Sequence, residues 1–324
     1  MVRCASQTAV RVLVGLLAYG FVLYRLTLAD WALLGQMFAQ GRWLPLLTVL
    51  LVLLMMAAVW AVEALKWLLT TRGFMPTSFA LSWRAVWYGV AVGLLSPNRI
   101  GEPLGRMAQV PQRHRPNALA ASVWCAMGQQ LATLLFGGIA LGLCYPMGLV
   151  PDVPVWMLGV AAGAIALAMC VLLTAMLRYG LLLDWLHRRR WVRRLLRADE
   201  RLSLPLARPT AITVIGLSLF KYVIFSTQYV LLLRAFGVDA PFAELYVGVA
   251  LSYLFVTFVP SVAATELAVR LGAALAIMGP LSQNQGGVAA AALALWAINM
   301  ALPALMAVWF RWPVPSYRAD NQIS

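Results

Sequence analysis

The sequence predicts an all-α polytopic membrane protein, folded as a single integral membrane domain over residues 1–324. Two observations indicate this class. Hydrophobic residues make up 63% of the chain and charged residues only 11%, whereas a soluble protein needs many more polar side chains to cover its surface. The apolar residues also fall in long stretches, and a membrane helix needs about 20 mostly apolar residues to cross the hydrocarbon core.

Six full transmembrane helices are expected from these stretches. They are Thr8–Leu28, Trp43–Leu69, Asn117–Tyr145, Val155–Leu177, Pro209–Phe236 and Gly287–Phe310. No small-residue cleavage pattern closes the first stretch, so an uncleaved span is favoured there over a signal peptide. Tryptophans such as Trp67, Trp83 and Trp156 fall near the ends of segments and are expected to anchor the chain at the membrane interfaces.

Two further apolar segments are each broken by a proline. The segment Trp83–Leu95 ends before Pro97, and the segment Phe242–Val259 ends before Pro260. Proline lacks a backbone donor and disfavours helix at the residue before it. Each region should therefore be a half-helix, a break and a second half-helix. We expect two re-entrant helical hairpins, each returning to the side of the membrane from which it entered.

The distribution of arginine predicts the orientation of these segments. The chain has a net charge of +14, and nine arginines lie from Arg178 to Arg208. If both hairpins return, nearly all extramembrane arginine lies on one side, as the positive-inside rule requires. We expect a multi-pass protein of the plasma or inner membrane with both termini in the cytoplasm. The basic linker 178–208 should form a cytoplasmic amphipathic helix on an anionic leaflet, or serve only to set the orientation.

The order of the elements predicts an inverted repeat of two halves, at about residues 8–145 and 155–310. Each half has the order span, span, hairpin, span, and three crossings per half would invert the second copy relative to the first. The hairpin tips would then meet near the midplane. The chain has only two lysines, Lys66 and Lys221, and each lies in the span before a hairpin. Similarity between the halves by chance is the alternative.

Each break is followed by a glutamate and, four residues later, an arginine: Glu102 with Arg106, and Glu266 with Arg270. A charged side chain at membrane depth costs at least about 2.5–3.5 kcal/mol, so two such pairs indicate a site. The spacing lets each pair close on one helical face. A purely structural role, in which the pairs hold the hairpins in place, is the alternative.

The two lysines differ in their local surroundings. Lys66 lies three residues after Glu63 near the end of a span, so this pair favours a structural role. Lys221 lies near the middle of its span without a local acid, and we expect it to reach Glu266 or a substrate.

The restarted helices suggest an anion site. Ser96 or Asn98 can cap the first and Ser261 the second, and helix N-termini attract anions. Arginine forks suit phosphate, and lipid phosphate is the anion most available at this depth. The complete candidate substrate-binding set is Lys66, Asn98, Arg99, Glu102, Arg106, Lys221, Ser261, Glu266 and Arg270.

Other polar residues within the spans leave two interpretations open. Gln129, Gln130 and Asn299, with the kinking Pro303, could line a cavity or make hydrogen bonds between helices. Cysteine and histidine spacing predicts no metal site, and we expect no cofactor. The expected partners are anionic membrane lipids rather than nucleic acid, because the basic residues lie near segment ends or in the motifs. The oligomeric state is left open.

In its charged motifs the chain resembles the transmembrane region of the lysylphosphatidylglycerol synthase/flippase family, which includes the flippase part of multiple peptide resistance factor. The resemblance rests on Glu63-Ala64-Leu65-Lys66-Trp67, on Pro97-Asn98-Arg99-Ile100-Gly101-Glu102 with Arg106, and on Pro260-Ser261 with Thr265-Glu266 and Arg270. The second motif has Val262-Ala263-Ala264-Thr265 where the family commonly has glycines, so it looks like a variant branch.

This resemblance implies an integral membrane protein that moves lipids, or polyprenyl-linked headgroups, between leaflets. The aminoacyl-transferring members carry an added cytosolic domain, for which these 324 residues leave no room, so we expect no lipid aminoacylation. The leading hypothesis is therefore a flippase-like lipid translocase that binds a phosphate-bearing headgroup between the two hairpins.

Two alternatives belong to other functional classes. A membrane enzyme acting on a lipid-linked substrate could use Glu102 or Glu266 as general base. It is the less favoured reading, because no nucleophile, histidine or metal cluster accompanies either carboxylate in the sequence. A non-transporting membrane partner of a lipid or glycan pathway is the other alternative.

The orientation can be tested at the turn between the third and fourth spans. A single cysteine at Asp152, in a chain otherwise free of cysteine, should be labelled in intact cells by a membrane-impermeant maleimide. A cysteine at Ser203 in the basic linker should react only after the cells are opened. Labelling in the reverse order would contradict the predicted topology.

Overall fold

The computed structural model describes residues 46–94, 96, 99–149, 153–189, 204–259 and 266–309. Across these ranges the secondary structure is helical and contains no strand, which confirms the all-α class for this part of the chain. The expected first span, Thr8–Leu28, lies outside the described residues. The structure therefore bears on five of the six expected spans.

Five helical stretches are long and apolar enough to cross a membrane: Leu47–Thr71, Gln112–Cys144, Val155–Leu177, Arg208–Ala235 and Gln285–Ala307. They correspond to α3 (Leu46–Thr71), α6 (Arg115–Cys144), α7 (Val155–Leu177), α10 (Arg208–Ala235) and a last run made of α13 (Gln285–Trp296), a π-helical turn (Ala297–Ala301) and α14 (Leu302–Trp309). Each overlaps an expected span, and the protein is embedded in a membrane.

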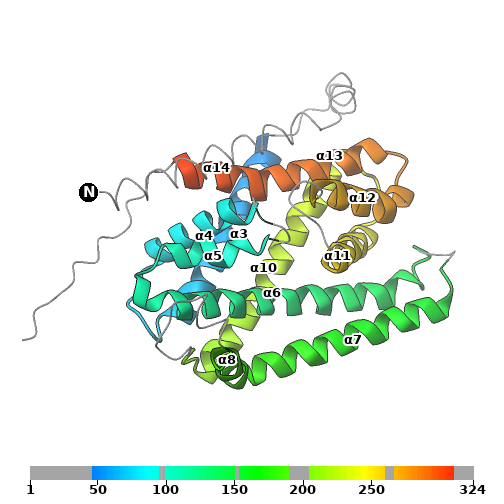
Figure 1. Cartoon of the computed structure of the whole chain (residues 1–324). Helices are drawn as coiled ribbons and strands as arrows, with labels where there is room; N and C mark the ends of the chain where they lie inside the picture. The colour runs from blue at the N-terminus through cyan, green and yellow to red at the C-terminus, as the bar shows by residue number, and fades with distance from the viewer. Residues whose placement is uncertain are drawn as a thin grey trace, which may run out of the picture.

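The outer face of α7 is apolar and exposed. Figure 1 shows α7 running beside α6 along one side of the molecule. Val160, Leu167 and Val171 are 65%, 66% and 61% exposed, whereas Ile165 and Met176 are buried. An exposed apolar surface of this extent is expected where a helix faces lipid rather than water.

The first broken segment forms a tight antiparallel hairpin of α4 (Phe79–Leu94) and α5 (Gly101–Ala108). A Cβ on Gly105 would lie 2.8 Å from the Cα of Gly89, and one on Gly93 would lie 3.1 Å from the Cβ of Glu102. The glycines therefore let the two helices approach closely. At the break, Ser96 Oγ accepts a hydrogen bond of 2.7 Å from the Gly101 amide. The re-entrant path of this hairpin through a bilayer stays a prediction.

The second broken segment pairs α11 (Phe242–Phe258) with α12 (Glu266–Met278). Leu245 and Val249 of α11 pack with Ala274 and Met278 of α12 in one buried cluster. The connection between these helices, residues 260–265 with the predicted cap Ser261, lies outside the described residues. The order long helix, hairpin, long helix thus occurs at α3 to α6 and again at α10 to α14, while the inversion of the second half stays a prediction.

A buried amide pair joins α3, α10 and the last helical run. Gln228 Nε2 donates to the Val52 carbonyl at 2.9 Å, and Asn299 Nδ2 donates to Gln228 Oε1 at 2.9 Å. Of the two interpretations of Asn299, hydrogen bonding between helices is therefore the observed one. The π-helical turn at Asn299 precedes Pro303, whose ring would clash with the carbonyl four residues earlier in a regular helix.

One of the expected interface tryptophans is placed differently. Trp67 is fully buried, and its Nε1 donates to Ser122 Oγ of α6 at 3.0 Å. The prediction of an interface anchor is wrong for Trp67, because the face of α3 that carries it packs on α6. Trp156, at the start of α7, is 69% exposed as expected.

The short connecting helix α8 (Tyr179–His187) exposes Leu181 and Trp185, in keeping with an amphipathic linker.

The close approach of α4 and α5 predicts that a substitution at a glycine between these helices lowers stability, whereas one at an open glycine does not. Gly105→Ala should lower the Tm of the detergent-solubilised protein, because the added methyl group meets backbone atoms and such overpacking costs about 1–3 kcal/mol. Gly163→Ala in α7 is the matched control. Nothing lies within 4 Å of its added Cβ, so its Tm should stay unchanged or rise with the better helix propensity of alanine. Equal Tm changes in the two variants would contradict the packing described.

Candidate functional site

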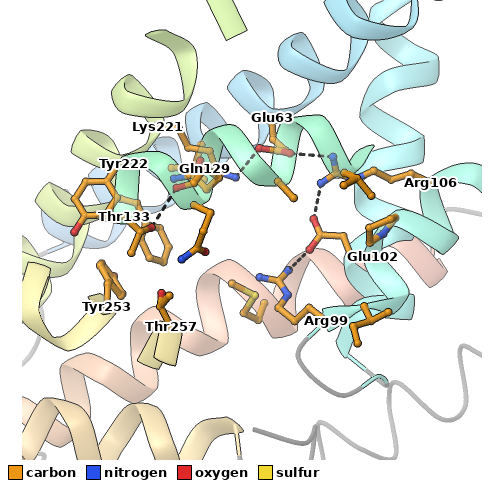
Figure 2. A pocket seen from close by; sticks show the side chains of 18 of the residues that line it. Glu63, Arg99, Glu102, Arg106, Gln129, Thr133, Lys221, Tyr222, Tyr253 and Thr257 are labelled. Atoms are coloured by element: carbon orange, nitrogen blue, oxygen red, sulfur yellow. Dashed lines mark hydrogen bonds and ion pairs between the residues drawn. The ribbon is translucent and has the colours of Figure 1, made fainter. Parts of the chain in front are cut away.

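Glu63 of α3 is buried and binds three cationic side chains from three helices. Its Oε2 accepts from Lys66 Nζ at 3.1 Å and from Lys221 Nζ of α10 at 2.8 Å. Its Oε1 accepts from Arg106 Nη1 of α5 at 2.9 Å. Figure 2 shows the carboxylate between Lys221 and Arg106. Each of these hydrogen bonds joins a cationic donor to a carboxylate, and such charge-assisted bonds are stronger than bonds between neutral groups.

The contacts continue from Arg106 towards the break in the first hairpin. Arg106 Nη2 donates to Glu102 Oε1, and Arg99 Nη2 pairs with Glu102 Oε2 at 3.0 Å. These contacts form a continuous series, which we name the ion-pair chain (Figure 2): Lys221, Glu63, Arg106, Glu102 and Arg99. The pair between Glu102 and Arg106, predicted from their helical spacing, is present.

The cations of this cluster differ in exposure. The side chains of Lys66 and Arg106 are 0% and 4% exposed, and Lys66 also donates to the Cys125 carbonyl of α6 at 3.3 Å. The side chains of Lys221 and Arg99, at the two ends of the ion-pair chain, are 14% and 23% exposed. Lys66 and Arg106 are therefore fixed inside the protein, while Lys221 and Arg99 can meet a ligand.

A cavity of about 700 Å³ lies against the ion-pair chain. Its charged lining, within the described residues, consists of Arg99, Arg106, Lys221 and Arg270 with Glu63 and Glu102. Arg99, Arg106 and Lys221 face two carboxylates, so the described lining carries a formal excess of positive charge before Arg270 is counted. A volume of this size is within the usual range of ligand pockets.

The remaining lining includes exposed apolar side chains as well as polar and aromatic ones. Ile100 just before α5, Leu104 of α5 and Val123 of α6 line the cavity and are 66%, 45% and 39% exposed. The polar and aromatic lining includes Gln129, Gln130, Thr133, Tyr222, Phe225, Tyr253 and Thr257. The two glutamines therefore line a cavity, which was one of their two interpretations. The cavity combines a cationic wall with an exposed apolar edge.

The structure brings five of the nine predicted site residues to this cavity: Arg99, Glu102, Arg106, Lys221 and Arg270. Lys66 lies behind the wall and contacts Glu63. Asn98, Ser261 and the side chain of Glu266 lie outside the described residues, so the expected pair between Glu266 and Arg270 stays a prediction. Of the alternative caps for the first hairpin, Ser96 makes the observed hydrogen bond.

The predicted contact of Lys221 with Glu266, whose side chain lies outside the described residues, or with a substrate stays a prediction. The observed acid partner is one that the sequence pattern did not indicate: Lys221 Nζ donates to Glu63, 158 residues away in sequence. The physical reason is that α10 packs along α3, as Gln228 and Val52 also show. From the sequence we expected Glu63 to pair only with the nearby Lys66. That prediction did not include its position at the centre of the contacts with Arg106 and Lys221. A signal was present, because Glu63 is the single acid within the six expected spans.

No family model matches the chain, and no curated protein matches it. The fold and the site define the class by themselves: a helical membrane protein with an internal, ion-paired and amphipathic cavity. In the described part of the chain, no three His, Cys, Asp or Glu side chains are grouped so that they could hold a metal ion.

The burial of Glu63 predicts a large effect on stability. Glu63→Gln keeps the shape of the side chain but leaves Lys66, Arg106 and Lys221 without their shared anion. Removing one partner from a buried ion pair costs about 3–5 kcal/mol. The Tm of the purified variant should therefore fall well below that of the wild type.

A second variant separates the loss of charge balance from general damage. In Glu63→Gln/Lys66→Met the buried ammonium group is removed together with the carboxylate, so part of the lost Tm should return. If the double variant is no more stable than Glu63→Gln, or if Glu63→Gln alone is as stable as the wild type, the assigned role of Glu63 is wrong.

Proposed function

We propose that the protein is a flippase-like lipid translocase that binds a phosphate-bearing lipid, or a polyprenyl-linked headgroup, in the cavity beside the ion-pair chain. The observation that carries this proposal is the excess of cationic side chains in a lining that also has an exposed apolar rim. The resemblance of the motifs around Glu63 and Glu102 to the lysylphosphatidylglycerol synthase/flippase family supports it. The proposal includes a plasma or inner membrane location with cytoplasmic termini.

The charges of the cavity favour an anionic headgroup. Lys221, Arg106 and Arg99 share the two carboxylates of Glu63 and Glu102, so the ion-pair chain carries one more positive than negative charge. Guanidinium groups bind phosphate oxygens through parallel N–H donors, and a lysine adds a compact positive charge. Phosphate is the anion that every phospholipid carries into a membrane.

We assign the direct phosphate contacts to Arg99 and Lys221. They are the most exposed cations of the ion-pair chain and lie at its two ends. Each can therefore turn to a ligand while the contact between Glu63 and Arg106 stays intact. Arg99 also has a left-handed backbone with φ of 58°, a conformation that costs a non-glycine residue about 1–2 kcal/mol and is concentrated at functional sites.

We propose that Glu63 and Glu102 balance the charges of the cavity cations while no lipid is bound. They hold Lys221 and Arg99 until a phosphate takes over these contacts. A cation that exchanges one anionic partner for another is never left buried and unpaired, which keeps the energetic cost of the exchange low.

The apolar rim gives the lipid tails a place outside the cavity. Ile100, Leu104 and Val123 lie where α5 and α6 border the cavity, and all three are exposed. With the headgroup at the cationic wall, acyl chains can pass over this rim and stay in hydrocarbon, where their burial is favourable. Relative motion of the two halves would then carry the headgroup from one leaflet to the other.

The proposal is tested by lipid exchange in reconstituted vesicles. With a fluorescent anionic phospholipid and an external quencher, Arg99→Gln should reduce the protein-dependent exchange rate about tenfold, because one charge-assisted hydrogen bond to phosphate is lost. The wild-type protein should exchange the lipid faster than vesicles without protein.

Arg234→Gln is the matched control for the loss of an arginine. Arg234 pairs with the exposed Asp239 at 2.9 Å and is not part of the cavity lining, so its exchange rate should equal that of the wild type. A folded Arg99→Gln protein with wild-type exchange, or a wild-type protein without exchange, would overturn the proposal.

A further inference from the structure

The cavity has a second region that the proposed phosphate contacts leave unused. We name it the polar-aromatic end; it consists of Gln129 and Thr133 of α6, Tyr222 of α10, and Tyr253 and Thr257 of α11. Figure 2 shows these side chains on the other side of the cavity from the pair of Arg99 and Glu102. All five are uncharged, and Figure 2 shows Lys221 of the ion-pair chain beside Gln129 and Tyr222.

Three buried polar atoms at the polar-aromatic end have no hydrogen-bond partner among the described residues: Gln129 Oε1 and the hydroxyls of Tyr222 and Tyr253. Leaving such a group unpaired is costly. Gln228 shows the contrast, because its amide donates to the Val52 carbonyl and accepts from Asn299. Both groups of the Gln228 amide are therefore bonded within the protein, whereas Gln129, which lines the cavity, keeps a side-chain oxygen without a partner among the described residues.

The tyrosine hydroxyls also exceed what packing requires. The Tyr222 ring stacks on Phe136 with centroids 4.6 Å apart, and the Tyr253 ring lies 5.3 Å from that of Phe225. Phenylalanine would make the same ring contacts. A tyrosine adds a polar tip, which when buried usually finds a hydrogen-bond partner. The hydroxyl of Tyr253 is therefore a polar group that ring packing does not explain.

We infer that the polar-aromatic end binds an uncharged, hydroxyl-bearing group, such as a sugar or a polyol, attached to the phosphate of the transported lipid. Amides and hydroxyls both donate and accept hydrogen bonds, as alcohol groups do, and the tyrosine rings offer apolar surface to the carbon skeleton. A cationic group would instead meet the positive excess of the lining. This inference rests on the proposed function, because it assigns the remainder of the same headgroup.

The experiment compares two lipids that share one phosphodiester charge and differ in the group attached to it. Phosphatidylinositol and phosphatidylmethanol with identical acyl chains both carry one phosphodiester charge, but only the first has a polyol. Their dissociation constants are measured by titrating the purified full chain and recording bound lipid by native mass spectrometry. The wild type should prefer phosphatidylinositol about tenfold, the effect of two hydrogen bonds of ordinary net strength.

Variants of the polar-aromatic end should remove this preference. Tyr253→Phe removes a single oxygen atom and should lower the preference about threefold. Tyr253→Phe/Gln129→Leu should abolish the preference. Both variants should bind phosphatidylmethanol with the same dissociation constant as the wild type. Tyr246→Phe on the same helix is the control. Its hydroxyl bonds to Thr227 at 2.9 Å and does not line the cavity, so the preference should be kept.

The outcomes separate this inference from the proposed function. Equal binding of the two lipids by the wild type, or an unchanged preference in the folded double variant, overturns the polyol assignment and leaves anionic-lipid binding standing. If neither lipid binds, or if Arg99→Gln binds phosphatidylmethanol as tightly as the wild type, the phosphate assignment fails and the polyol assignment fails with it.

Discussion

The buried carboxylate of Glu63 is the constraint on which the rest of the site depends. Lys66, Arg106 and Lys221 all donate to it, and they come from α3, α5 and α10. Hydrocarbon offers no hydration to a charged group, so each of these cations must find an anion inside the protein. One acid thereby fixes the short helix of the first hairpin against two long helices, and the cavity lies beside these contacts.

Close packing in the first hairpin makes this arrangement sterically possible. Gly89 and Gly105 bring α4 and α5 together at a distance that no larger side chain would allow, and Arg106 of α5 is then held at Glu63. The same helix presents Glu102 at the cavity, with Arg99 just before it. Backbone packing and charge pairing therefore support each other, since a shift of α5 would separate Arg106 from its buried anion.

Differences in burial divide similar residues into structural and ligand-binding roles. Lys66 and Lys221 contact the same oxygen of Glu63, but only Lys221 lines the cavity. Gln228 and Gln129 are both glutamines in membrane helices, yet the amide of the first is hydrogen-bonded and the side-chain oxygen of the second has no partner among the described residues. The proposed translocase uses the member of each pair that lines the cavity, because a ligand in the cavity can reach only those side chains.

The sequence by itself determined the features that depend on neighbouring residues. The long helices α6, α7 and α10 lie within a few residues of the expected spans, because apolar length alone decides whether a segment can cross a membrane. The pair of Glu102 and Arg106 follows from helical spacing. Only the tertiary structure decided the acid partner of Lys221 and the buried position of Trp67. Glu63 and Lys221 are 158 residues apart, and Trp67 meets Ser122 across 55 residues, so helix packing and not local pattern brings these groups together.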